Sequence, residues 1–149
     1  MGQESTTPLY SGTYERSMDA KNRVAIPSGW TRGEGEEFHV IPHPTDGFLM
    51  VMPLAEFDRW EQRIQESNAS SADKRRAIRM FYSEARAVTT DKQGRILVPE
   101  GHCTRAGLKG EVVFVGGRSR FEIWAKDRHA ASVENDTAVF ERVANEIGL

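Results

Sequence analysis

The chain has 149 residues, of which 38% are hydrophobic and 28% are charged, and its formal net charge is −2. This composition is ordinary for a globular protein and excludes a chain that is disordered throughout. No apolar run approaches the roughly 18 residues that span a bilayer, and no secretory leader is evident, so we expect a cytoplasmic protein without a membrane partner. The single cysteine, Cys103, excludes an internal disulfide and fits a reducing compartment.

We expect residues 1–10, which are polar, to form a mobile leader, followed by a first β unit at 11–57. Near its start lies a short motif that recurs 72 residues later and fits D-x-x-x-R-[VI]-x-[IV]-P both times, at 17–27 and 89–99. The residue before each arginine is Asn or Gly, the types that most readily adopt a positive φ angle. An alternating apolar run then ends at proline. Each copy therefore predicts a strand, a tight turn and a second strand that form a local hairpin.

Each predicted turn carries an acid, a lysine and an arginine. The six residues are Asp19, Lys21 and Arg23 in the first copy and Asp91, Lys92 and Arg95 in the second. Residues 12–32 carry four Lys or Arg against two acids, and 73–99 carry seven against three, whereas 33–66 carry two against eight. This distribution predicts one basic face that contacts a repetitive anionic partner. An aspartate and an arginine four residues apart can also pair and only rigidify the turn, so either copy alone leaves a structural role open.

The first unit continues with a single helical turn that packs Trp30 downward and a hairpin of 38–41 with 48–52. A helical connection is expected at 58–84. An amphipathic helix that starts at Pro53, near the end of the first unit, leads into it, and a second helix capped by Ser70 follows. The second helix has an apolar stripe opposite a basic face of Lys74, Arg75, Arg76 and Arg79, which favours a solvated face over a ligand contact.

The second half repeats the plan of the first, with a second unit at 85–128. It contains a short helix at 100–107 and a hairpin of 111–116 with 121–124, and a C-terminal helix at 129–149 closes the chain. A unit of about 50 residues is small for a core of its own, so two units sharing one core are expected. The predicted fold class is mainly β with flanking helices (α+β), built from two pseudo-symmetric units.

The doubled motif, its flanking strands and the segment Phe-Glu-Ile-Trp at 121–124 resemble the MraZ family of bacterial transcriptional regulators, within the AbrB-like swapped-hairpin superfamily. The resemblance covers 11–128. It implies an internally duplicated swapped-hairpin barrel, ring-shaped homo-oligomers and association with the nucleoid. It further implies repression of the division and cell-wall gene cluster through short direct repeats in promoter double-stranded DNA. The DNA-binding positions implied by motif match are Asp19, Lys21, Arg23, Asp91, Lys92 and Arg95.

Two further expectations concern the aspartates and the apolar surface. Because a carboxylate beside phosphate is not itself attractive, each aspartate should hold its own arginine or cap the turn amides. Large apolar residues such as Trp60, Phe81 and Phe140 exceed what one small barrel needs, which predicts subunit contacts in a head-to-tail homo-oligomer larger than a dimer.

Enzyme and cofactor chemistry is not expected. The histidines stand at no recurring metal-ligand spacing, and His102 beside Cys103 is a poor catalytic pair because sequence neighbours seldom present their side chains to each other. The sequence has no phosphate-binding glycine motif, so we expect no cofactor and no small-molecule substrate. A protein-interaction or antitoxin-like module that docks an acidic protein through the same basic turns stays open. Salt-sensitive binding of duplex DNA over an unrelated acidic protein would decide between the two.

Overall fold

A computed structural model of the chain describes residues 9–149. The strands are β1 (Thr13–Ser17), β2 (Arg23–Ala25), β3 (Glu37–Pro42), β4 (Leu49–Pro53), β5 (Arg86–Thr89), β6 (Arg95–Leu97), β7 (Glu111–Gly116) and β8 (Phe121–Ala125). The helices are the 3-10 turn η1 (Ser28–Trp30) and α1 (Leu54–Phe57), α2 (Arg59–Gln65), α3 (Ser71–Ser83), α4 (Glu100–Ala106) and α5 (Lys126–Glu146). Within the described residues, one six-stranded antiparallel sheet has the order β1-β7-β8-β4-β3-β5, and β2 and β6 form a second sheet. The expected mixture of sheet and flanking helices is confirmed.

The strands on either side of each motif turn pair with distant parts of the chain. Strand β1 pairs with β7 and β5 pairs with β3, whereas β2 and β6 pair with each other. The prediction of two local hairpins was therefore wrong. Pairing between the copies brings Val24 and Ile96, each 1% exposed, into one core. An isolated local hairpin of three-residue strands would be too small to bury these side chains.

The other two predicted hairpins are confirmed. Strands β3 and β4 pair with Val40 opposite Val51, and strands β7 and β8 pair with Phe114 opposite Ile123. These four side chains are fully buried. Because the central strands of the large sheet come from both halves of the chain, the two halves share one hydrophobic core, as their small size led us to expect.

The helices follow local signals closely, with one exception. Ser70 precedes α3, and its hydroxyl accepts a hydrogen bond from the backbone N–H of Asp73 at 3.1 Å. Helix α4 ends at Gly107, whose φ is 68°. The amphipathic helix expected after the first unit is divided at Asp58 into α1 and α2, and Pro53 stands just before the first helical residue instead of at it.

An aromatic cluster fills the principal core beneath η1. Trp30 is 7% exposed and lies 5.0 Å from Phe121 and 5.8 Å from Tyr10, measured between ring centroids. Tyr10, which we expected to be part of the leader, is 2% exposed and forms backbone hydrogen bonds with Arg118. Tyr10 therefore belongs to the folded body. The other positions of that leader, apart from Leu9, lie outside the described residues.

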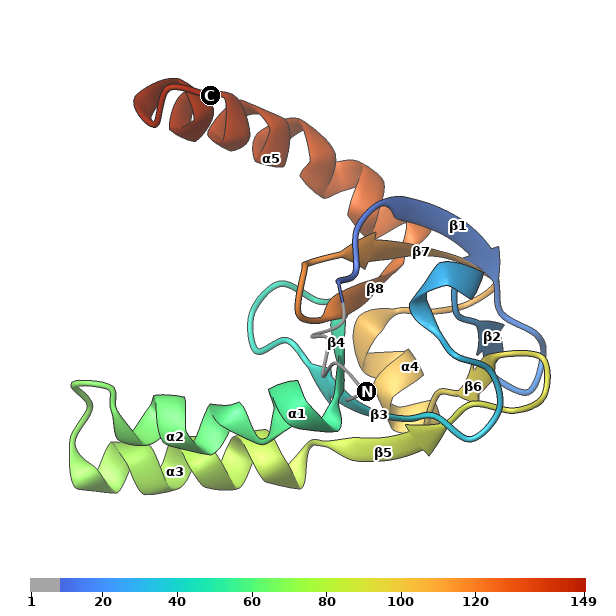
Figure 1. Cartoon of the computed structure of the whole chain (residues 1–149), viewed down its shortest axis with the longest axis horizontal. Helices are drawn as coiled ribbons and strands as arrows, with labels where there is room; N and C mark the ends of the chain where they lie inside the picture. The colour runs from blue at the N-terminus through green and yellow to red at the C-terminus, as the bar shows by residue number, and fades with distance from the viewer. Residues whose placement is uncertain (1–8) are drawn as a thin grey trace, which may run out of the picture.

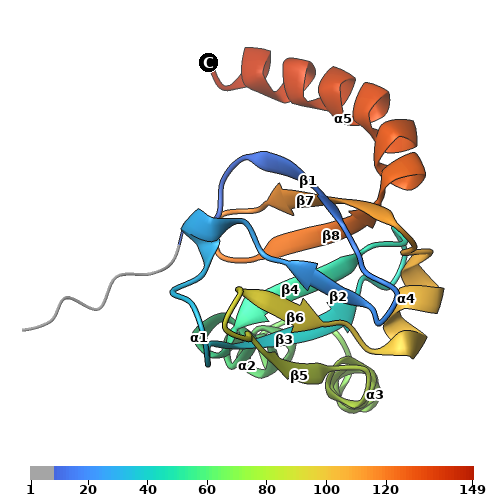
Figure 2. The ribbon, with the colours of Figure 1, turned by 90° about the vertical axis from the view of Figure 1, so that its right-hand side faces the viewer.

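Two helical projections extend from the sheet body, and the motif turns lie away from both (Figure 1). The α2–α3 pair extends from one side, and α5 extends from the end of β8. Figure 2 shows β2 and β6 side by side, with the turn that precedes each strand at opposite ends of this small sheet. The body therefore presents both motif turns on the side that is remote from the free ends of the helices.

Candidate nucleic-acid interface

The first motif turn is held by the carboxylate of Asp19. Its Oδ1 accepts hydrogen bonds from the backbone N–H groups of Lys21 at 2.9 Å and Arg23 at 2.8 Å, and its Oδ2 accepts one from Arg23 Nε at 2.7 Å. Asn22 supplies the positive φ, 65°, that the turn requires. The backbone N–H of Arg23 and then its guanidinium hold the pKa of Asp19 below its usual value. The aspartate thus stays ionised and fixes the direction of the arginine.

The second motif turn repeats this arrangement atom for atom. Asp91 Oδ1 accepts from the backbone N–H groups of Gln93 and Arg95, both at 2.9 Å, and Oδ2 accepts from Arg95 Nε at 2.9 Å. Gly94 has a φ of 74° at the place of the asparagine. The pKa of Asp91 is lowered, chiefly by the backbone N–H of Arg95 and then by its guanidinium. The expectation that each aspartate holds its own arginine and caps the turn is confirmed.

A pseudo-two-fold axis relates the two turns. Val24 pairs with Ile96, its own counterpart in the other copy, and Arg23 and Arg95 each lie one residue from that pair, on opposite sides. The hydrogen bonds that extend the small sheet also correspond, with Ile26 N–H donating to Gly94 O at 3.0 Å and Val98 N–H donating to Asn22 O at 2.9 Å. The arginines therefore occupy equivalent places on the outward face of β2 and β6.

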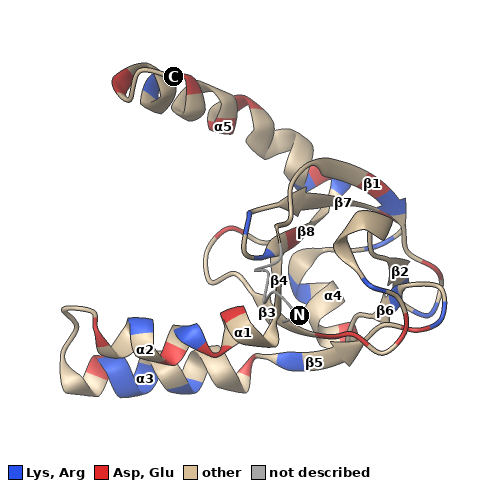
Figure 3. Cartoon of the chain, in the orientation of Figure 1, with Lys and Arg blue, Asp and Glu red and all other residues tan. Residues whose placement is uncertain are grey.

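The charged groups of the two copies form one cluster, because Arg95 Nη1 also lies 3.9 Å from Asp19 Oδ2. The side chains of Asp19, Arg23, Asp91 and Arg95 are each between 29% and 37% exposed. Two arginines balance two aspartates here, so the net positive charge comes from the exposed lysines at the turns, Lys21 and Lys92. Figure 3 shows basic and acidic residues close together along these turns. We call the outward surface of β2, β6 and both turns the turn face.

The seven basic residues counted over 73–99 lie in three places. Lys92 and Arg95 lie on the turn face, Arg86 lies on β5, and the other four belong to α3, on the helical projection at the other end of the molecule (Figure 3). The charge count had grouped them because they are close in sequence. The basic patch that can contact one surface is therefore smaller than the count indicated, and it consists of residues from both motif copies.

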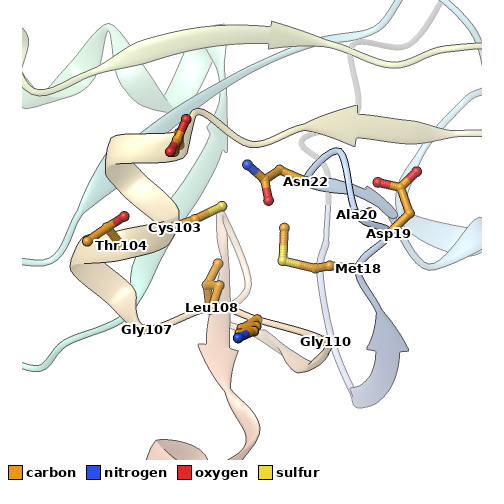
Figure 4. A pocket seen from close by; sticks show the side chains of 11 residues that line it. Met18, Asp19, Ala20, Asn22, Cys103, Thr104, Gly107, Leu108 and Gly110 are labelled. Carbon is orange, nitrogen blue, oxygen red and sulfur yellow. The ribbon is translucent and has the colours of Figure 1, made fainter.

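The two copies differ behind their turns. A cavity of about 800 Å³ separates the first turn from α4, and Met18 and Cys103 point into it whereas the Asp19 carboxylate points away (Figure 4). At the counterpart of Met18, the Thr90 hydroxyl instead accepts a hydrogen bond from the Glu36 backbone N–H at 2.9 Å and donates to Gly33 O. The Thr90 side chain therefore bonds the second turn to the loop before β3, whereas Met18 at the first turn is held through its backbone N–H, which donates to Gly110 O at 2.7 Å.

Cys103 has the environment of a structural cysteine. It is 5% exposed in α4, and burial raises the pKa of its thiol above the usual value. A neutral, buried thiol is a weak nucleophile. Its neighbour His102 is also buried, and His102 Nε2 lies 2.8 Å from the backbone oxygen of Glu84.

Over residues 9–149, no group of three His, Cys, Asp or Glu side chains is arranged to hold a metal ion. No helix in the same described part of the chain is long and apolar enough to cross a membrane. Gln93 and Leu97 also lie exposed on the turn face and were not among the predicted site residues. Comparing the two motif copies position by position could have found them, because each differs in chemistry from its counterpart.

Comparison with known proteins places both halves of the chain in one family. Residues 9–80 and 81–147 each match the family described as "MraZ protein, putative antitoxin-like". A protein of Symbiobacterium thermophilum named transcriptional regulator MraZ is 36% identical over 138 residues, which are 93% of this chain and 99% of the relative. Relatives of the same name from Pelotomaculum thermopropionicum and Clostridium acetobutylicum are 35% and 32% identical over 93% and 95% of this chain, and over 95% and 100% of their own. With two family matches and relatives aligned over almost its whole length, the chain belongs to the MraZ family.

Proposed function

We propose that this protein is a sequence-specific DNA-binding regulator of transcription that contacts duplex DNA through the turn face. The observation that carries the proposal is the pair of half-buried, outward-facing arginines, each held in the same way by an aspartate and related by a pseudo-two-fold axis. A purely structural ion pair needs neither this symmetry nor an exposed lysine at each turn. The names of the relatives, which call them transcriptional regulators, support the same function.

The residues of the turn face have different roles in this proposal. Arg23 and Arg95 reach guanine edges in the major groove, because a guanidinium can donate two hydrogen bonds to O6 and N7 of guanine. Lys21 and Lys92 are exposed point charges that contact phosphates. Asp19 and Asp91 do not contact DNA but hold the arginines in position before binding, which lowers the entropy lost when the complex forms.

The assembly is also part of the proposal. We infer a swapped-hairpin barrel in which the two units are interleaved, and the pairing of β2 with β6 supports it. Several chains form a ring that binds short direct repeats in a promoter, so that later contacts become intramolecular and avidity rises by roughly 10² to 10⁴. Following the family resemblance, the regulated genes are the division and cell-wall cluster, the effect is repression, and the protein is cytoplasmic and associated with the nucleoid.

The test is a binding titration of the full chain on the duplex upstream of its own gene, on a scrambled duplex and on an unrelated acidic protein. We expect tight binding to the first that weakens as salt rises, because phosphate contacts release counterions. Footprinting on the same duplex should locate protected repeats. Equal affinity for the native and scrambled duplexes would contradict sequence-specific binding.

The second candidate function is an antitoxin-like module that docks an acidic protein through the turn face. The words "antitoxin-like" in the family description and the surplus of positive charge at the turns favour it. The same titration separates the two functions. Salt-sensitive binding to the acidic protein that exceeds binding to either duplex would favour the module over the DNA-binding regulator.

A further inference from the structure

The two halves of the turn face have the same backbone but carry different side chains. The backbone N–H groups of Lys21 and Gln93 are both bonded to the motif aspartate of their own turn, each at 2.9 Å. The two positions are therefore equivalent in place and different in chemistry. Four pairs of corresponding positions on this face differ, namely Ala20 and Lys92, Lys21 and Gln93, Ala25 and Leu97, and the positive-φ pair Asn22 and Gly94.

Leu97 is the largest apolar group on the turn face. Its neighbour Ile96 points into the core and is 1% exposed, so the alternation of a strand directs Leu97 outward, and it is 57% exposed. It lies directly opposite Arg23 in the small sheet, whereas Arg95 lies opposite the much smaller Ala25. An exposed apolar side chain beside a base-reading arginine can contact the methyl group of thymine.

Gln93 differs from its counterpart in what it can recognise. A lysine ammonium is a point charge that contacts phosphate or guanine, whereas a glutamine amide can form two hydrogen bonds with N6 and N7 of adenine. Gln93 is exposed at the second turn, and the hydrogen bond from its backbone N–H to Asp91 orders the residue that carries this amide. The second turn can therefore distinguish bases that the first turn, with Lys21, does not.

We propose that Gln93 and Leu97 are specificity-determining residues that make the turn face read a directional DNA sequence. This inference rests on the proposed function, the binding of duplex DNA by the same face. A reader with two identical halves related by a two-fold axis recognises a palindrome. Here the backbone and the arginines keep the two-fold relation and the neighbouring side chains break it. Successive chains in a ring then bind repeats that all point the same way.

The test replaces the distinguishing residues of the second turn with those of the first. The variant K92A/Q93K/L97A loses one lysine and gains one, so its net charge and its non-specific attraction to phosphate are unchanged. The matched control L54A/Q65K/K74A makes the same chemical changes on α1, α2 and α3, at the other end of the molecule. All three proteins are full-length, and equal thermal midpoints and circular dichroism spectra establish that they are folded.

Each protein selects binding sites from a library of random-sequence duplexes. We expect the wild-type chain and the control to select the same non-palindromic site, and the turn variant to select a site whose two halves are related by a dyad. Single variants identify which base each side chain reads. Gln93→Lys should reduce discrimination for adenine at one position by roughly 5- to 150-fold. Leu97→Ala should reduce the preference for thymine by about fourfold for each methylene-sized group of the leucine side chain that no longer contacts the thymine methyl.

The outcomes separate this inference from the function on which it rests. A palindromic site selected by the wild-type chain, or an unchanged site selected by the turn variant, would overturn the roles of Gln93 and Leu97 and leave sequence-specific DNA binding in place. Failure of the wild-type chain to enrich any sequence would overturn the proposed function and this inference together.

Discussion

Arg95 in the second copy of the motif lies 3.9 Å from the carboxylate of Asp19 in the first copy, measured from Nη1 to Oδ2. Asp19 thus contacts two arginines, because its Oδ2 also accepts a hydrogen bond from Arg23 Nε at 2.7 Å. Asp91 contacts Arg95 at 2.9 Å. The two turns are equivalent in their backbone, but the first aspartate is close to both arginines and the second to one.

The first prediction follows from this difference. Asp19→Asn should lower the ratio of specific to non-specific DNA affinity more than Asp91→Asn. It weakens the hydrogen bond that holds Arg23 and also removes the second carboxylate contact of Arg95, whereas Asp91→Asn affects Arg95 alone. Each substitution removes one negative charge, so any general gain in attraction to phosphate is the same for both. Titrations of both variants on a specific and a scrambled duplex measure the two ratios. An equal decrease of the ratio in both variants would contradict the role of Asp19 in positioning both arginines.

A second prediction separates base contacts from phosphate contacts. Arg95→Ala should cost about 1 to 3 kcal/mol on the specific duplex and relax base preference at one position. Lys92→Ala should weaken binding to all duplexes alike and reduce the slope of log affinity against log salt by about 1. Titrations at several salt concentrations provide both quantities. The same loss for Arg95→Ala on specific and scrambled DNA would reduce that arginine to a phosphate contact.

The lowered pKa values of Asp19 and Asp91 predict how stability depends on pH. A carboxylate whose pKa is lower in the folded state stabilises the fold fully above its unfolded pKa, which is about 3.9, and this contribution is lost as pH falls through the folded pKa. The urea midpoint of the wild-type chain should therefore decline on acidification below about pH 4 more steeply than that of a D19N/D91N variant. Urea unfolding from neutral to strongly acidic pH compares the two. Parallel curves would show that the hydrogen bonds of the two turn aspartates do not cause the loss of stability at acidic pH.

A fourth prediction concerns the pairing between the two copies. Ile96 is 1% exposed and pairs with Val24, so Ile96→Ala should cost about 2 to 5 kcal/mol in the free energy of unfolding through reduced burial and the cavity left behind. The adjacent Leu97 is 57% exposed and provides the matched control, for which the expected change is within about 0.5 kcal/mol. Denaturant unfolding measures both variants. Similar losses at the two positions would mean that the small sheet does not bury Ile96.

The last prediction concerns assembly through α5. The apolar side chains Val133, Phe140 and Val143 of α5, and Ile147 directly after it, are 41% to 71% exposed, which is more apolar surface than an isolated helix usually presents to water. We expect a homo-oligomer larger than a dimer at micromolar concentration, and a smaller species for Phe140→Glu. Light scattering of that variant, with Glu134→Ala as the control on the same helix, measures the change. A wild-type monomer that binds repeated operators no better than a single repeat would contradict assembly and avidity together.

Several features could be predicted from the sequence because their causes are local. Ser70 as a helix cap and Gly107 as a helix end depend on the side chain at one position and on backbone groups within a few residues. The same holds for the turns, where Asp19 and Asp91 bond to backbone amides two and four residues later. For this reason the hydrogen bonds of the aspartates to their arginines and turn amides were correctly predicted before the fold was known.

By itself, then, the sequence determined the doubled motif, its turn chemistry, the two long hairpins and most helix boundaries. Only the tertiary structure decided that β2 pairs with β6, that Arg95 lies near Asp19 and that α3 with its basic residues lies far from the turns. The physical reason is that a short strand exposes the same hydrogen-bonding groups to every possible partner. The partner is selected because its pairing buries Val24 and Ile96, which are 72 residues apart in the sequence, in the same hydrophobic core.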